Sequence, residues 1–174
     1  MGERSRSVDT DVVRQLASTG GAMSGWEVAD AVMRRDREAA MAAARHGDVP
    51  VGCVVSRDGR VLAAAGNERE LRGDPTAHAE ILALRDAAIS LGDWRLIACE
   101  VHVPLEPCPM CAGACVHARV QRLVYGCADE RAGAAGTVFD IANSPRLNHR
   151  VEVTGGVLAA ESRGLLQQFF RARR

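Results

Sequence analysis

Two short segments of the chain hold the residue types from which a catalytic metal centre is built. They are Thr-Ala-His-Ala-Glu at residues 76–80 and Glu-Pro-Cys-Pro-Met-Cys at residues 106–111. Zinc prefers thiolate and imidazole ligands, and a catalytic zinc site combines three protein ligands with one open position. His78, Cys108 and Cys111 supply such a set. Glu80 is then a spare carboxylate that can move a proton at a metal-bound water, so the pattern predicts metal-assisted hydrolysis.

Both segments are expected at the start of a helix. A proline in the first turn predicts one helix over residues 75–91, ended by Gly92, and a second helix over residues 109–118. His78 and Glu80 cannot share one helix face, because side chains two positions apart do not face each other. They can both reach one ion if that ion lies beyond the helix N-terminus, where the second helix brings its cysteines.

The other cysteines leave alternatives open. A lone Cys-x-x-Cys is often a redox pair, and Cys115 lies one helical turn after Cys111, so a cluster of cysteines alone is a second possibility. That cluster would leave His78 and Glu80 without a role. A structural zinc ribbon would need a second closely spaced Cys pair, which the sequence lacks. The simplest expectation is that the remaining cysteines are buried thiols, namely Cys53, Cys99, Cys115 and Cys127.

The elements around these segments predict an α/β fold. The expected elements are a hairpin at 51–55 and 60–65, strands at 96–103, 122–126 and 151–153, and helices at 26–45, 75–91, 109–118 and 160–171. Strands that alternate with helices after a hairpin favour a mixed sheet covered on both faces, which is a three-layer α/β/α sandwich. The length of 174 residues suits one domain. We expect residues 1–25 to be a mobile extension and residues 26–174 to form the domain.

The distribution of charge and of apolar residues indicates local contact with phosphate groups and excludes a membrane span among the expected features. The net charge is zero, yet residues 144–174 carry six Arg against two Glu, so attraction to phosphate must be local. All 22 basic residues are Arg, which suits phosphate contacts, although a GC-rich genome produces the same bias. The longest apolar run has six residues, at 39–44, against about 20 for a membrane span. No secretory signal begins the chain, and a cytoplasmic location is expected.

From residue 48 to the C-terminus the chain resembles the bacterial tRNA-specific adenosine deaminases. Paired His-x-Glu and Pro-Cys-x-x-Cys segments are typical of zinc-dependent nucleobase deaminases. The matching pieces are Asp-Pro-Thr-Ala-His-Ala-Glu-Ile from 74, Leu-Glu-Pro-Cys-Pro-Met-Cys-Ala-Gly-Ala from 105, Gly-Ala-Ala-Gly-Thr from 133, Leu-Asn-His-Arg-Val-Glu-Val from 147 and Phe-Phe-Arg-Ala-Arg-Arg from 169. The last two pieces separate this family from relatives that act on free bases or nucleotides.

The resemblance implies a cytidine-deaminase-like fold and a specific reaction. One Zn²⁺ per chain would be held by His78, Cys108 and Cys111, and Glu80 would shuttle protons. Adenosine at the wobble position of a tRNA anticodon would be hydrolysed to inosine, with release of ammonia. The implied partners are the anticodon stem-loop, in particular that of an ACG-anticodon arginine tRNA, and a second copy of the chain in a homodimer.

The resemblance also implies a set of substrate contacts. They fall on Asn67, Asn148, Asp129, Phe169, Phe170 and Arg173. Simpler roles stay open for several of them. Asp129 can be a turn residue, at least one of the two phenylalanines is expected to pack in the core, and the basic C-terminus can be a solvated helix end.

Two rival functions remain at this point. A free nucleobase or nucleotide deaminase, acting on guanine or cytosine, would use the same zinc chemistry; Asn148 and the basic tail argue against it. A zinc-stabilised RNA-binding module without catalysis would have no need of Glu80.

Overall fold

The computed structural model describes residues 47–173 of the chain. The expected N-terminal extension and the expected helix at 26–45 lie outside these residues. The described part begins with the expected hairpin, formed by β1 (Gly52–Arg57) and β2 (Arg60–Gly66). Its two-residue turn has positive φ at both Asp58 (50°) and Gly59 (72°), the conformation whose twist matches that of the paired strands.

The central sheet has five strands in the order β2-β1-β3-β4-β5. The three further strands are β3 (Cys99–Leu105), β4 (Arg122–Cys127) and β5 (Glu152–Thr154). β1 pairs antiparallel with β2 and β3, whereas β3, β4 and β5 run parallel to one another. The expected mixed sheet is therefore confirmed, and the parallel strands are joined by crossovers as they must be.

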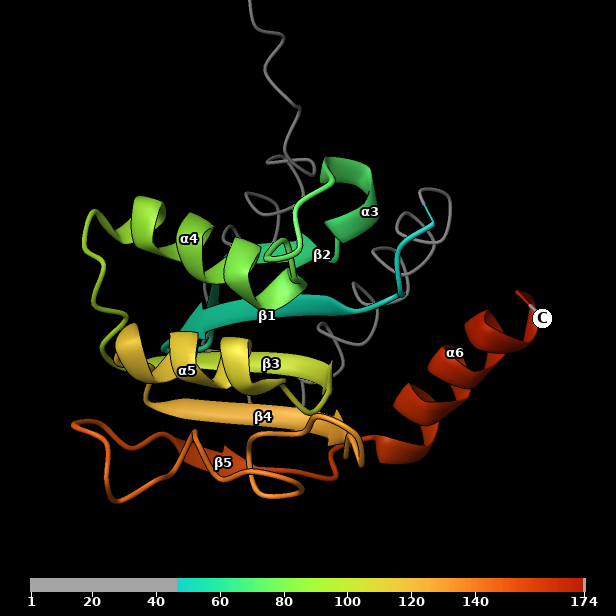
Figure 1. The fold of residues 1–174 in the computed structure, drawn as a ribbon. Helices are drawn as coiled ribbons and strands as arrows, with labels where there is room; N and C mark the ends of the chain where they lie inside the picture. The colour runs from blue at the N-terminus through green and yellow to red at the C-terminus, as the bar shows by residue number, and fades with distance from the viewer. Residues whose placement is uncertain (1–46, 174) are drawn as a thin grey trace, which may run out of the picture.

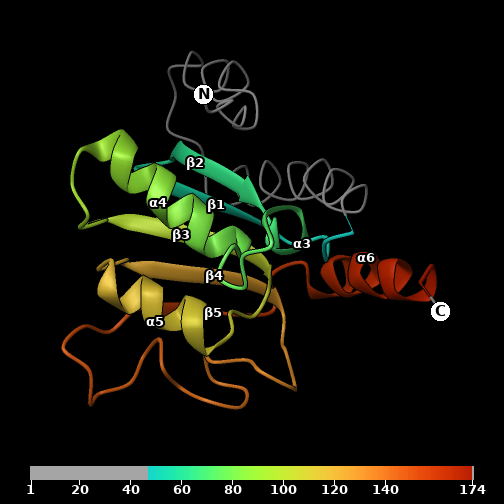
Figure 2. The ribbon, with the colours of Figure 1, turned by 45° about the horizontal axis from the view of Figure 1, so that its top comes forward.

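Two helices form a layer on one face of the sheet, α4 (Ala79–Leu91) and α5 (Pro109–His117). Figures 1 and 2 show both helices on the same side of the strands, with α4 over β1 and β2 and α5 beside β3 and β4. Every second residue of the strands points into the core between the sheet and these two helices. Val55, Val101 and Leu123 are such residues, and each is fully buried. This packing fixes where the two helices begin.

The closing helix α6 (Ala159–Arg171) docks against β4 and β3 and then extends past the end of the sheet (Figure 1). Ser162 and Leu166 are its buried residues. Ser162 packs against Gly126 of β4. Successive residues of a strand point to opposite faces of the sheet, so Gly126 faces away from Leu123, three residues earlier. The first turn of α6 therefore lies on the face opposite to Leu123. Helices on both faces of the mixed sheet agree with the expected sandwich.

Several expected boundaries are wrong by a few residues; the strand expected from residue 96, for example, begins at Cys99. The helix expected from residue 75 begins at Ala79, because the Asp74 carboxylate accepts hydrogen bonds from the Thr76 N–H (2.8 Å) and hydroxyl (2.7 Å) and closes a turn there. The strand expected to end at Val103 continues to Leu105, which pairs with Cys127. The helix end at Gly92 is confirmed, with φ of 68° in the left-handed region.

Candidate active site

His78, Cys108 and Cys111 come together where α4 and α5 begin. His78 is the N-cap residue of α4 and Cys108 the N-cap residue of α5, while Cys111 lies in the first turn of α5. The His78 Nδ1 atom lies 3.5 Å from the Cys111 Sγ and 3.8 Å from the Cys108 Sγ. All three donor atoms lie within 4.8 Å of one another. The two helix N-termini thus converge on one point, as the sequence led us to expect.

The donor set and its spacing fit a metal ion. Tetrahedral zinc with bonds of about 2.3 Å to sulfur and about 2.0 Å to nitrogen separates neighbouring sulfur and nitrogen ligands by roughly 3.5 Å. The two nitrogen–sulfur distances in this group are close to that separation. We refer to His78, Cys108 and Cys111 as the metal-ligand group, because the three residues could hold a metal ion.

The metal-ligand group already stabilises a thiolate. A hydrogen bond from the Cys111 thiol, aided by His78, lowers the pKa of Cys108 to about 4 although burial opposes the shift. The hydrogen bond to Cys108 and burial both raise the pKa of Cys111. The hydrogen bond therefore favours the thiolate at Cys108 over that at Cys111, and a cation between the two sulfurs would favour ionisation of both.

Glu80 lies beside this group in the first turn of α4 and is only 5% exposed. Burial raises the pKa of its carboxyl, while its own backbone N–H and the nearby His78 act in the opposite direction. A buried carboxyl with a raised pKa next to a possible metal site is suited to accept and return protons near neutral pH.

Asn67 is placed close to the metal-ligand group by its neighbour. It follows β2, and the next residue, Glu68, donates its N–H to the Ala77 carbonyl, one residue before His78. The Asn67 Nδ2 donates to the Val49 carbonyl at 3.4 Å. Its Oδ1 is buried and accepts no hydrogen bond within residues 47–173. An acceptor buried next to a candidate site and left without a donor suits a ligand.

Asp129 lies in a loop after β4 that also contacts the metal-ligand segment. Its carboxylate accepts the N–H groups of Arg131 (2.9 Å) and Ala132 (3.3 Å), so it closes a turn. Later in the same loop Ala134 donates its N–H to the Pro107 carbonyl at 2.8 Å, directly before Cys108. The loop therefore lies beside the metal-ligand group.

Asn148 is not brought to the metal-ligand group within the chain. Its Oδ1 accepts a hydrogen bond from Arg119 at 2.9 Å, and Arg119 follows the C-terminal end of α5, whereas the metal-ligand group is at the N-terminal end. The two residues after it are also used within the fold: His149 contacts the Val120 carbonyl at 2.7 Å, and Arg150 donates to Asn143. Asn148 and His149 fasten the chain to the segment that follows α5, and Arg150 holds the loop at Asn143.

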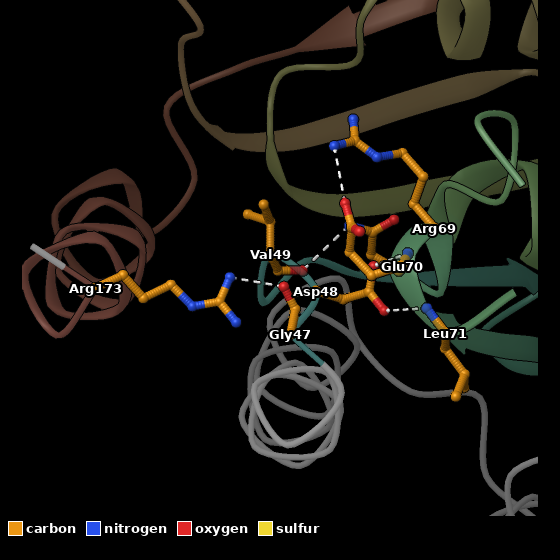
Figure 3. Close-up of polar contacts among 8 residues, drawn as sticks. Gly47, Asp48, Val49, Arg69, Glu70, Leu71 and Arg173 are labelled. Atoms are coloured by element: carbon orange, nitrogen blue, oxygen red, sulfur yellow. Dashed lines mark hydrogen bonds and ion pairs between the residues drawn. The ribbon is translucent and has the colours of Figure 1, made fainter. Parts of the chain in front are cut away.

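The two aromatic residues at the end of α6 pack against each other, and Arg173, two residues after the helix, packs on Phe169. The Phe169 and Phe170 rings meet edge to face at 5.4 Å, and Phe170 is 52% exposed. The Arg173 guanidinium lies 4.2 Å from the centre of the Phe169 ring, and it donates to the Gly47 carbonyl at 2.6 Å (Figure 3). Phe170 is therefore the more accessible of the two rings.

Two buried carboxylates were given no role by the sequence reasoning. Asp48 accepts the N–H groups of Glu70 (2.7 Å) and Leu71 (3.2 Å) in the short helix α3 (Arg69–Arg72), next to the contact of Arg173 with Gly47 (Figure 3). Glu106 is 1% exposed and accepts three backbone N–H groups from the loop after β4. The only signal in the sequence is that each acid borders an apolar strand.

The remaining features agree with simple structural roles. The four other cysteines are buried, as expected. Among the described residues no helix has the length and apolar character to cross a bilayer.

Comparison with known proteins places these features in a family. A family model described as MafB19-like deaminase matches residues 28–174. A tRNA-specific adenosine deaminase from Bacillus subtilis (strain 168) is 42% identical over 139 residues, which cover 80% of this chain and 86% of that protein. Another, from Haemophilus influenzae, is 44% identical over 149 residues, covering 85% of this chain and 86% of that protein.

Comparison with solved structures also finds deaminases. One from "Biochemical and Structural Studies of A-to-I Editing by tRNA:A34 Deaminases at the Wobble Position of Transfer RNA" superposes with a TM-score of 0.74 at 38% identity, over 79% of this chain and 99% of that one. A guanine deaminase from Bacillus subtilis reaches a TM-score of 0.55 at 28% identity, over 87% of this chain and 94% of that one. These likenesses confirm the expected fold class.

Proposed function

The chain belongs to the tRNA-specific adenosine deaminase family, and from this we propose that it hydrolyses adenosine to inosine at the wobble position of a tRNA anticodon, with release of ammonia. The observation that carries the proposal is the convergence of His78, Cys108 and Cys111 with Glu80 buried beside them. We propose the cytoplasm as the site of the reaction, which agrees with a tRNA substrate.

We assign the three residues of the metal-ligand group to one zinc ion per chain. Two sulfurs and one imidazole nitrogen are ligands that zinc favours, and three protein ligands leave one coordination position open. A zinc ion held by these three residues would supply the Lewis acidity that makes water a strong nucleophile at neutral pH.

Glu80 moves the protons. Its carboxylate takes a proton from the attacking water and passes one to the ring nitrogen next to carbon 6, as the new carbon–oxygen bond forms. It then helps to deliver a proton to the amino group, so that the carbon–nitrogen bond breaks and ammonia leaves. Adenosine and water are thereby converted to inosine and ammonia. The raised pKa of Glu80 suits a group that must both accept and donate protons.

The substrate contacts are assigned from the residues that remain. The Oδ1 of Asn67, which accepts no hydrogen bond from the described residues, is suited to a donor group of the extruded nucleoside. Asp129 and the end of α6, with Phe170, Phe169 and Arg173, would face the anticodon loop, where an exposed ring can stack on a base. A wobble base already lies in a single-stranded loop, so extruding it costs less than from a duplex. An ACG-anticodon arginine tRNA is the proposed substrate.

We further propose that the enzyme is a homodimer. A groove of about 460 Å³ runs between α4 and α5, and its lining is mainly apolar. The lining residues include Ile81, Leu84, Ala88, Trp94, Ala114 and Ala118. Trp94 is 55% exposed at its edge. A second copy of the same apolar face would cover it.

The test is a direct comparison of substrates. The protein is incubated with ACG-anticodon arginine tRNA and separately with free adenosine, cytosine and guanine, while inosine and ammonia are measured. We expect ammonia from the tRNA alone, with one inosine per tRNA. The second candidate, a free-base deaminase, is favoured by the likeness to guanine deaminase, and ammonia from guanine but not from tRNA would establish it instead.

A further inference from the structure

Glu106 directly follows β3 and lies two residues before Cys108, and its carboxylate is hydrogen-bonded by backbone N–H groups of a loop far along the chain. The Oε1 atom accepts the N–H groups of Ala135 (3.0 Å) and Thr137 (3.1 Å), and Oε2 accepts the N–H of Asp129 (3.1 Å). A carboxylate taken out of water persists only where such donors replace the lost hydration. The carboxylate therefore joins the two ends of the segment 129–137, which we call the substrate-side loop.

The substrate-side loop is built around this carboxylate. A Cβ atom at Gly133 would collide with the Glu106 carboxylate, so the loop approaches at a distance that only glycine permits. The Gly133 N–H donates to the Asp129 carbonyl at 2.9 Å, and the neighbouring Ala134 donates to the Pro107 carbonyl. The same turn thus encloses Glu106 and touches the residue before Cys108.

We propose that Glu106 is a positioning residue that fixes the substrate-side loop as one wall of the substrate pocket. The inference rests on the proposed function, because it assigns the loop, through Asp129, to contact with the RNA. Glu106 does not touch the reacting atoms in this proposal; it acts through the main chain that carries Asp129. Its role is separate from metal binding, which belongs to the metal-ligand group.

The pattern of bonds predicts which end of the loop depends on the negative charge. Glutamine in place of Glu106 offers one acceptor oxygen and one N–H₂ donor. The oxygen can keep the two bonds to Ala135 and Thr137, but the amide nitrogen then faces the Asp129 N–H, which is also a donor. The substitution therefore releases Asp129 selectively while it preserves the size of the side chain.

The test compares Glu106→Gln with Glu152→Gln in the full-length enzyme. Glu152 is an exposed acid on the edge strand β5, outside the substrate-side loop, so its substitution removes the same charge without disturbing those bonds. For Glu106→Gln we expect unchanged zinc content, amide exchange near Asp129 faster by about tenfold, and a KM for the anticodon stem-loop raised by about tenfold, with a smaller change in kcat. Glu152→Gln should match the wild type in all four measurements.

Three results would overturn the proposal. The first is an amide exchange rate at Asp129 in Glu106→Gln equal to that of the wild type, and the second is an unchanged KM for the anticodon stem-loop. The third is loss of zinc together with activity, which would place Glu106 with the metal ligands. If Glu106→Gln does not fold, Thr137→Val serves in its place: it removes the hydroxyl bond to Glu106 and should shift exchange and KM in the same direction, by less. If the wild type forms no inosine in any tRNA, the proposed function fails, and amide exchange still decides whether Glu106 positions the loop.

Discussion

The metal-ligand group and Glu80 lie side by side where α4 and α5 begin, yet metal binding and proton transfer are separable there. We predict that Glu80→Ala keeps zinc and lowers kcat by about 10²–10⁴-fold or more, because only the proton shuttle is removed. Cys108→Ala should lose zinc as well as activity, because two ligands hold zinc poorly. Elemental analysis alongside an inosine assay checks both. Zinc lost from Glu80→Ala but retained by Cys108→Ala would reverse the assignment.

The hydrogen bonds of Glu106 lead us to predict that the stability of the protein depends on pH. Burial raises the pKa of its carboxyl, but the hydrogen bonds from Thr137, Ala135 and Asp129 outweigh burial and lower it. A carboxyl whose pKa is lower in the folded than in the unfolded state stabilises the fold above its unfolded pKa and loses that contribution as the pH falls. The difference in Tm between the wild type and Glu106→Gln should therefore be largest near pH 7 and shrink below about pH 4.3. A difference independent of pH would show that the charge of Glu106 is not responsible.

Single residues also show what the sequence could and could not predict. His78, Cys108 and Cys111 were identified because metal ligands have characteristic residue types and spacing. Glu106 received no role, because its partners lie more than twenty residues further along the chain and are backbone groups that no motif marks. The role of Asn148 in holding the substrate stays a prediction; within the chain its Oδ1 accepts a hydrogen bond from Arg119. A motif marks a residue without stating which neighbour the fold will give it.

At the scale of elements, the helix ends were predicted best where local chemistry determines them. Gly92 ends α4 in the left-handed conformation and Pro109 starts α5, both by backbone preferences that act within one turn. The start of α4 and the end of β3 were misplaced by a few residues. The start of α4 depends on the turn closed by Asp74, and the end of β3 depends on pairing with β4. Local residue propensities contain no information about either contact.

The docking of α6 gives a prediction with an internal control. A Cβ at Gly126 would collide with the Pro104 carbonyl and the Ser162 hydroxyl, whereas a Cβ at Gly164, within α6, meets nothing within 4 Å. Gly126→Ala should lower the free energy of unfolding by about 1–3 kcal/mol through overpacking. Gly164→Ala should raise it by about 0.5–1 kcal/mol, because alanine favours the helix. Urea denaturation measures both, and equal effects from the two substitutions would contradict the docking of α6 on β4.

At the scale of the whole molecule, the groove between α4 and α5 predicts how two copies associate. Removing a large aromatic residue from an interface commonly costs at least about 2 kcal/mol, or roughly 30-fold in the dissociation constant. Sedimentation at micromolar concentration should show a dimer for the wild type and weaker association for Trp94→Ala. Phe170→Ala is the control, because that ring is about equally exposed but lies on α6, away from the groove. A monomeric wild type that still edits tRNA would reject the dimer.

Charge is distributed unevenly over the molecule, and the excess lies at the C-terminus. The chain is neutral, yet residues 144–174 carry four more Arg than Glu, so phosphate attraction is local. Arg173 is held against Gly47 and Phe169, which fixes its position but leaves its charge in place. Arg171 lies in the last turn of α6. The end of α6 therefore presents its charge from a fixed point on the fold.

The salt dependence of tRNA binding tests whether this charge meets the RNA. An arginine that neutralises one phosphate of a single-stranded loop contributes about 0.7 to the slope of log K against log salt concentration. Replacing Arg171, Arg173 and Arg174 together by Gln should therefore flatten the slope by about 2 and weaken binding, with zinc content unchanged. Gln at Arg57 and Arg60, on the turn between β1 and β2, is the control and should leave the slope as it is. A triple variant with the wild-type slope would mean that these arginines form a solvated helix end and that the anticodon loop binds elsewhere.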